Sequence, residues 1–228
     1  MLHTILPEGL RFGVLFDRLT SVHSIYTRAE EALASFRARN GLSCPAGCGT
    51  CCEGFIPDVL PLEASYLAAW LVRNRPERAR EMAESDAVLP TGPGCPLYDP
   101  NKPEAHCTVY PGRPLICRLF AFSGVRAKGG QASFALCRGM PDLPSPRSGA
   151  RTWEGPELET LFGPPPLMSD FGAELEGIVP GDGSRRAPLT EALPPAIRQI
   201  VFLSELGGRG DPNRDGNDPV LPPLPRAS

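Results

Sequence analysis

The chain has 228 residues, 41% of them hydrophobic, which suffices for one packed domain with appendages but not for two full-sized domains. Its formal net charge is -3 with both signs interspersed, so we expect neither a nucleic-acid partner nor binding to an acidic lipid surface. No segment approaches the roughly 20 uninterrupted apolar residues of a membrane span, and the N-terminal residues form no basic leader, so we expect no membrane anchor and a cytoplasmic location.

Two helices are predicted on either side of a cysteine-rich segment at residues 44–52. Apolar residues recur at three- and four-residue steps over residues 20–40, and Gly41 supplies a left-handed stop. Pro61 fits the first turn of a second helix, and Pro76 starts a further, more charged one. The cysteine-rich segment is therefore expected to be a connection between helices.

A small hairpin is predicted next, from residues 95–98 and 106–110. Pro114 then begins a helical turn that carries Cys117, and residues 132–136 have the composition of a strand. We predict an α+β fold, in which a small cysteine-rich metal-binding domain has helices flanking the cysteine cluster and a short hairpin.

The composition changes beyond Met140, where prolines become frequent. We therefore expect residues 1–140 to form the metal-binding domain, with a motif core at 44–137. Residues 141–228 are expected to be a proline-rich, partly irregular C-terminal extension. Within that extension, residues 196–206 have near-helical apolar spacing and are expected to dock on the core as a helix.

Cysteines carry the clearest chemical signal of the chain, since four of the eight fall within nine positions. Thiolates packed this closely repel one another unless a soft cation neutralises them, which indicates zinc or an iron–sulfur cluster. Four disulfides are the alternative, but the chain has no secretory signal and its vicinal Cys51 and Cys52 do not pair easily. The candidate metal ligands are Cys44, Cys48, Cys51, Cys52, Cys95, Cys107, Cys117 and Cys137.

The number of cysteines leaves the number of metal sites open. Eight thiols suffice for two four-thiolate sites, or for one site with spare or catalytic thiols.

The order of these motifs resembles a known family. Cys48-Gly-Thr-Cys51-Cys52 is followed by a Cys-Pro-Leu-Tyr-Asp run at residue 95 and by Cys-x-x-Tyr-x-x-Arg-Pro-x-x-Cys-Arg at residues 107–118. This combination, over about residues 40–140, is similar to the YkgJ-type cysteine-cluster family of CxxCxxCC zinc- or iron-chelating proteins. The resemblance implies a small α+β domain that holds an iron–sulfur cluster or zinc through its cysteines. It implies no shared activity, although relatives include a flagellin lysine methylase.

The chain departs from the family pattern at Cys44, which lies three residues before Cys48 instead of two. The resulting Cys-x-x-x-Cys-x-x-Cys spacing matches that of radical-SAM enzymes. We do not favour that assignment, because the chain lacks the strand–helix repeats that should follow the motif.

Two arginines flank Cys117 and are candidate cofactor-binding residues. Arg113 and Arg118 can donate hydrogen bonds to thiolates or sulfides and stabilise their negative charge. The alternative is that they are ordinary surface arginines or bind the C-terminal tail.

Three functions remain open from the sequence. The first is a metal-binding protein whose cysteines hold an iron–sulfur cluster or zinc, in redox chemistry or metal handling. The second is an enzyme that depends on such a cluster, either a protein-modifying, methyltransferase-like enzyme or an oxidoreductase. The third is a structural zinc module for interaction with a protein partner that the sequence does not identify.

Overall fold

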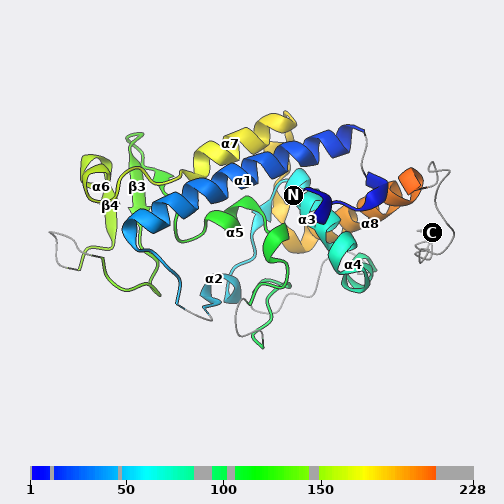
Figure 1. The fold of residues 1–228 in the computed structure, drawn as a ribbon, viewed down its shortest axis with the longest axis horizontal. Coiled ribbons are helices and arrows are strands. Elements are labelled where there is room, and N and C mark those ends of the chain that lie inside the picture. The colour runs from blue at the N-terminus through cyan, green and yellow to red at the C-terminus, as the bar shows by residue number, and fades with distance from the viewer. Residues whose placement is uncertain are drawn as a thin grey trace.

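The structure is a computed structural model that describes residues 2–10, 13–45, 48–84, 94–101, 106–143 and 149–208. It is elongated, and helix α1 (Val14–Asn40) runs along much of the long axis (Figure 1). Strands β3 and β4 lie toward one end, and helix α8 lies toward the other. The remaining helices are α2 (Thr50–Glu53), α3 (Pro61–Asn74), α4 (Pro76–Ala83), α5 (Leu115–Leu119), α6 (Gly155–Phe162), α7 (Met168–Ile178) and α8 (Leu189–Gly208).

Two small antiparallel sheets accompany the helices. The first pairs β1 (Asp58–Val59) with β5 (Ala187–Pro188), and the second has the order β2 (Val125–Arg126), β3 (Ala132–Ala135), β4 (Thr152–Glu154). Short 3-10 turns occur at Leu2–Thr4, Glu8–Leu10, Tyr110–Gly112 and Asp182–Arg185. The predicted α+β class is confirmed.

Helix α1 joins the two ends of the core. It starts at Val14, earlier than the expected residue 20, and the added turn buries Leu19. It ends as predicted at Gly41, whose φ of 62° is the left-handed conformation that glycine adopts at little cost. Near that end the ring of Phe36 meets the edge of Phe134 on β3, with 5.3 Å between ring centroids. This contact ties α1 to the second sheet.

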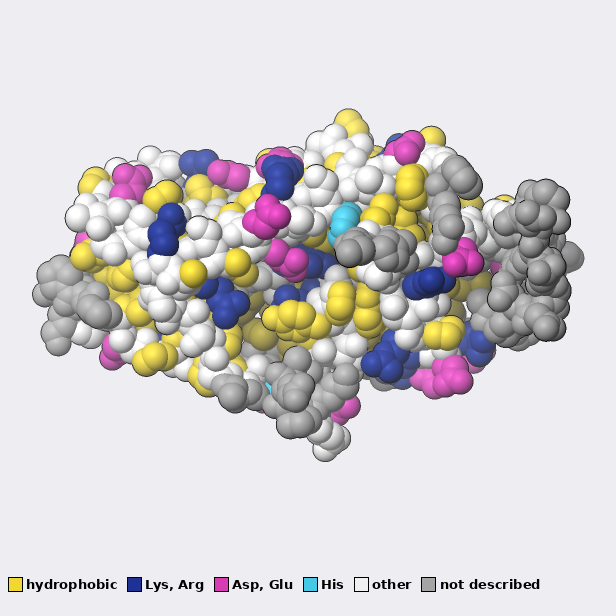
Figure 2. Space-filling view, viewed as in Figure 1, with side chains coloured by type: hydrophobic (Ala, Val, Ile, Leu, Met, Phe, Trp, Pro, Cys, Tyr) yellow, Lys and Arg dark blue, Asp and Glu magenta, His cyan; other side chains and the backbone are white. Residues whose placement is uncertain are grey.

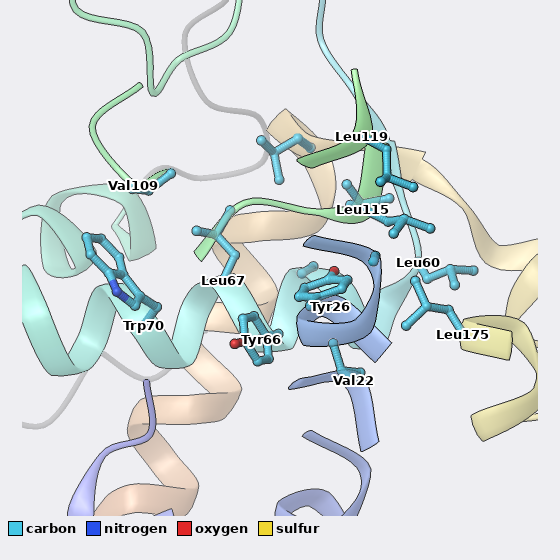
Figure 3. Close-up of a cluster of buried hydrophobic side chains, with 14 of the residues drawn as sticks. Val22, Tyr26, Leu60, Tyr66, Leu67, Trp70, Val109, Leu115, Leu119 and Leu175 are labelled. Carbon is cyan, nitrogen blue, oxygen red and sulfur yellow. The ribbon is translucent and has the colours of Figure 1, made fainter. Parts of the chain in front are cut away.

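Helix α3 lies at the centre of the core, since every residue from 62 to 71 is buried. It packs mainly against α8, and also against α1 and α4. In Figure 3, Tyr66 and Leu67 of α3 lie beside Tyr26 of α1, and Leu115 of α5 lies over them. Helices α3 and α4 begin at Pro61 and Pro76 as predicted.

A buried carboxylate fixes the start of α5 against α3. Glu63 is 3% exposed and accepts hydrogen bonds from the backbone N–H of Leu60 at 3.0 Å and of Leu115 at 2.8 Å, and from the Tyr26 hydroxyl at 3.0 Å. It thereby satisfies the first free N–H groups of two helices at once. Since Cys117 lies on α5, Glu63 also sets the position of that cysteine.

Residues 152–208 form regular structure and share the core of the first 140 residues. Trp153, Leu158 and Ile197 are fully buried in the same cluster as the apolar residues of α1 and α3. The helix expected at 196–206 is present as part of the longer α8, which is the main partner of α3. The hydrophobic core therefore does not end near residue 140 but continues into residues 152–208.

The surface seen in Figure 2 carries acidic and basic side chains in close alternation. Among the described residues, no helix combines the length and the apolar character needed to cross a bilayer.

His23 couples the stability of this core to pH. Its Nδ1 lies 2.8 Å from the Tyr66 hydroxyl, and burial, with a smaller contribution from the Arg118 cation, lowers the pKa of His23 below 6.5. Near pH 6.5, His23 of the unfolded chain therefore takes up a proton, whereas His23 of the folded chain stays neutral until a lower pH. We expect the free energy of unfolding to fall as the pH drops through and below 6.5. Urea unfolding of the wild type and of His23→Gln between pH 5.5 and 7.5 tests this, because only the variant should lack that part of the slope.

Candidate metal centre

The first four cysteines lie on and just before the short helix α2, at the lower edge of the molecule in Figure 1. Cys44 and Cys48 precede the helix, and Cys51 and Cys52 lie within it. Gly49 lets this segment approach the hairpin: a Cβ at this position would lie 2.6 Å from the rings of both His106 and Tyr98. A larger residue here would push α2 away from the remaining cysteines.

Cys95 and Cys107 come from the predicted hairpin, which forms as one β-bridge between Tyr98 and Cys107. The residues between 101 and 106 lie outside the described part of the chain. The hairpin is fastened to α2, because the backbone N–H of Cys95 donates to the carbonyl of Cys52 at 3.0 Å. The main chain therefore places Cys95 and Cys107 beside Cys52.

Cys117 lies on the predicted proline-started turn, observed as α5. Leu115 and Leu119 are buried and hold α5 on the core, whereas Cys117 is only partly buried. Burial raises the pKa of Cys117 to about 12, and the neighbouring charges of Cys95 and Cys107 act in the same direction. This cysteine therefore belongs to the neighbourhood of the hairpin thiols.

Cys137 follows strand β3 and approaches the cluster from the sheet. Its carbonyl accepts hydrogen bonds from the backbone N–H of Met140 at 3.0 Å and from the Arg151 guanidinium. The turn that follows is close to Cys48, whose Sγ would be 3.9 Å from a Cβ at Gly139. Four separate segments of the chain thus contribute thiols to one region.

All eight cysteines are thiols in the structure, and their charges interact. Burial raises the pKa of Cys44, and the charges of Cys48, Cys137 and Cys51 add to this effect. Burial likewise raises the pKa of Cys95 to about 11, with further contributions from Cys107 and Cys51. The neighbouring thiolate charges therefore make Cys44 and Cys95 harder to ionise, and a cation among the thiols would act in the opposite direction.

Cys51 and Cys52 form the closest pair, with 3.8 Å between their sulfur atoms. The hydrogen bond between the two sulfur atoms lowers the pKa of Cys51 to about 6 and raises the pKa of Cys52. The Arg113 cation also favours the Cys51 thiolate, though less strongly.

The donor set fits a thiophilic metal, but the thiols are not gathered around one point. Among the described residues, no group of three or more His, Cys, Asp and Glu side chains is placed to hold a single ion. In a tetrahedral zinc site with Zn–S bonds of about 2.3 Å, every pair of sulfurs lies about 3.8 Å apart. A single zinc would therefore have to draw additional thiols toward Cys51 and Cys52.

The two candidate arginines have different surroundings. Arg113 donates to the carbonyls of Tyr110 and Cys117 at 3.0 and 3.2 Å, and its charge lowers the pKa of both Cys51 and Cys117 against the larger effect of burial. Its position beside Cys51 and Cys117 is compatible with the charge-stabilising role predicted for it, which stays a prediction. Its guanidinium also lies 3.4 Å from the centre of the Tyr110 ring.

Arg118 is directed into the core and bound to other partners. Its guanidinium donates to the carbonyls of Arg113 and Pro111 and to the carboxylate of Glu30, and it lies 4.2 Å from the centre of the Tyr26 ring. These contacts describe a structural arginine, and they do not support the cofactor-binding role expected for it.

Sequence reasoning passed over two contributors to the site. Glu63 positions α5, and its signal was its place three residues after Leu60, just inside a proline-started helix. Glu53 accepts a hydrogen bond from the Tyr98 hydroxyl at 3.1 Å and so links α2 to the hairpin. No local pattern predicts that second contact.

A comparison with known protein families finds one match, to a family associated with zinc or iron. Residues 43–138 match the CxxCxxCC family, which is described as "Putative zinc- or iron-chelating domain". The matched segment includes all eight cysteines and agrees with the resemblance read from the motifs. Neither the curated proteins nor the solved structures include a match to this chain.

Proposed function

We propose that this protein binds an iron–sulfur cluster through its cysteine thiols and serves in electron storage or redox sensing. Its residues 43–138 match the CxxCxxCC zinc- or iron-chelating domain. The observation that carries the proposal is the spread of the thiols over α2, the hairpin, α5 and the turn after β3. An iron–sulfur cluster contains several irons and sulfides, so its cysteines surround a wider space than those of a single zinc ion. When bound, such a cluster supplies one-electron chemistry.

The residues of this chain would hold and tune the centre. The thiolates supply the ligands, and burial of Cys95 and Cys117 limits access of water to part of the site. Arg113 offsets some of the negative charge that the thiolates bring together. Glu63 holds α5, and with it Cys117, in a fixed position against α3.

Reduction of the anaerobically purified protein tests the redox function. We expect a broad visible absorption that bleaches on addition of dithionite and returns on reoxidation. A colourless protein that carries stoichiometric zinc would contradict the redox proposal and favour the structural alternative. The cluster-dependent enzyme and the interaction module remain predictions. Support for the enzyme would require a cofactor-dependent change in a partner protein.

Arg113 should tune the reduction potential. Replacing it with Gln removes a cation beside Cys51 and Cys117, so the more negative, reduced state is less stabilised and the midpoint potential should fall. Arg113→Lys keeps the charge and should lie closer to the wild type. A spectroscopic redox titration measures the effect, with Arg78→Gln on α4 as the control because Arg78 pairs with Glu81. Equal potentials for Arg113→Gln and the control would rule out this role.

A further inference from the structure

We propose that a pocket between α7 and the start of α5 is a binding site for a small organic cation, an ammonium group on a short aliphatic chain. The pocket has a volume of about 310 Å³, at the lower end of the range for small-molecule sites. Helix α7 forms one wall, and Glu63 of α3 with Leu115 and Ile116 of α5 forms another. None of the eight cysteines lines this pocket, so it is separate from the candidate metal centre.

Helix α7 is shaped so that the pocket stays open. Met168, Gly172 and Glu176 follow one another at four-residue steps and so share the face of α7 that lines the pocket. A Cβ at Gly172 would meet no atom within 4 Å. Glycine is less favourable than alanine inside a helix, so helix stability does not account for it here. The adjoining Leu175 is buried in the core with Leu60 and holds α7 in place (Figure 3).

The charges that line the pocket select a cation. Three carboxylates and one guanidinium are present, from Asp58, Glu63, Glu176 and Arg186. The guanidinium is shared between two of the acids, since it lies 3.0 Å from Glu176 and 3.8 Å from Glu63. Asp58 forms no ion pair within the described part of the chain. With three negative charges against one positive charge, the lining attracts a cationic ligand and repels an anionic one.

The buried carboxylate of Glu63 offers a position for a further hydrogen-bond donor. Its Oε1 accepts hydrogen bonds from the Leu115 N–H and the Tyr26 hydroxyl, and its Oε2 accepts one from the Leu60 N–H. A carboxylate has about four acceptor positions, so Oε2 retains the capacity for one more donor. Arg186 lies 3.8 Å from Oε2, which is too far for a hydrogen bond. An ammonium group in the pocket can supply the missing donor.

Apolar side chains in the lining account for the organic part of the ligand. Leu115 is buried, and Ile116 and Met168 are partly buried beside the carboxylates. Each methylene group removed from water raises affinity by up to about fourfold. A bare metal ion makes no use of such a wall, whereas an alkylammonium ion matches both the charge and the apolar surface.

Titration of the isotopically labelled wild type with n-butylammonium, followed by the amide shifts in NMR spectra at constant ionic strength, tests the proposal. We expect saturable shifts around α7 and the start of α5. Ethylammonium should bind about tenfold more weakly, because it has two methylene groups fewer. Butyrate has a similar size and the opposite charge, and 1-butanol is neutral, so neither should saturate the site. Absence of saturation by butylammonium, or equal binding of butyrate or butanol, would overturn the proposal.

Variants of α7 locate the binding. Gly172→Leu fills the pocket and should abolish the saturable shifts. Gly177→Leu is the matched control, because a Cβ at Gly177 also meets no atom within 4 Å but this glycine does not line the pocket.

A charge variant keeps the test valid if Gly172→Leu does not fold. Glu176→Gln should weaken butylammonium binding about tenfold. Glu174→Gln on the same helix should leave binding unchanged, because Glu174 pairs with Arg28 and does not line the pocket. Wild-type affinity in folded Gly172→Leu or in Glu176→Gln would show that the cation is held elsewhere and would refute the assignment.

Discussion

Replacing Glu63 with Ala should lower the free energy of unfolding by about 3 to 5 kcal/mol, the usual cost of removing one partner from a buried charged network. The side chain is 3% exposed and is the acceptor for the N–H groups of Leu60 and Leu115 and for the Tyr26 hydroxyl. All three donors would be left buried without this acceptor. Urea denaturation followed by circular dichroism measures the loss.

Two further variants make the Glu63 prediction specific. Both carboxylate oxygens of Glu63 accept hydrogen bonds from backbone N–H groups. Glu63→Gln keeps the shape of the side chain but replaces one of these oxygens with an NH₂ donor, so it should also destabilise strongly. Glu174→Ala removes a carboxylate whose partner, Arg28, is half-exposed, and it should cost less than about 1 kcal/mol. If Glu63→Ala and Glu174→Ala unfold at similar urea concentrations, Glu63 is not the residue that joins α3 to α5.

Arg118→Met should be the second most damaging single change, with a loss of about 2 to 4 kcal/mol. The substitution keeps an apolar stem of similar length but leaves the carbonyls of Pro111 and Arg113 without their donor. It also removes the cation above the Tyr26 ring. Glu30, which is 47% exposed, stays hydrated and adds little to the loss. Thermal and urea unfolding of the variant give the magnitude.

The metal content separates a structural Arg118 from a cofactor-binding one. Folded Arg118→Met protein should bind as much iron per chain as the wild type and show the same visible spectrum. The matched control is Arg28→Met, which breaks an exposed ion pair and should change stability by less than about 1 kcal/mol. A normal melting temperature together with a shifted spectrum would show that Arg118 acts on the centre after all.

Single residues in the sequence were sufficient to predict where the helices that flank the first cysteines begin or end. Pro61 and Pro76 start helices because their fixed φ and missing N–H suit the first turn, and Gly41 ends one because it adopts positive φ cheaply. These properties belong to single residues, so they can be read without knowing the fold. The start of α1 at Val14 was missed because burial of Leu19 depends on distant partners.

Amino-acid composition alone did not predict the regular secondary structure beyond residue 140. The prolines of this region suggested irregular structure, yet among the described residues Pro156 lies in the first turn of α6, and Pro194 and Pro195 lie inside α8. Strand β5 exists because it pairs with β1, about 130 residues earlier, and no local pattern can predict that pairing.

The sequence could propose which cysteines are candidate ligands but not how they are arranged. The close packing of four thiols indicated a metal, and the motif order at residues 95–118 added further cysteines as candidates. Arg113 and Arg118 looked equivalent because both lie near Cys117 in the sequence. They differ because α5 turns Arg118 toward Glu30 and Tyr26, whereas Arg113 precedes the helix and stays beside the thiols.

The most direct test of the central claim is the content of iron, acid-labile sulfide and zinc in protein produced and purified without oxygen. The account predicts iron and sulfide in nearly equal amounts, little zinc, and a brown colour that is lost on exposure to air. A protein free of all three, with eight thiols that titrate as free, would contradict the claim that these cysteines form a metal centre.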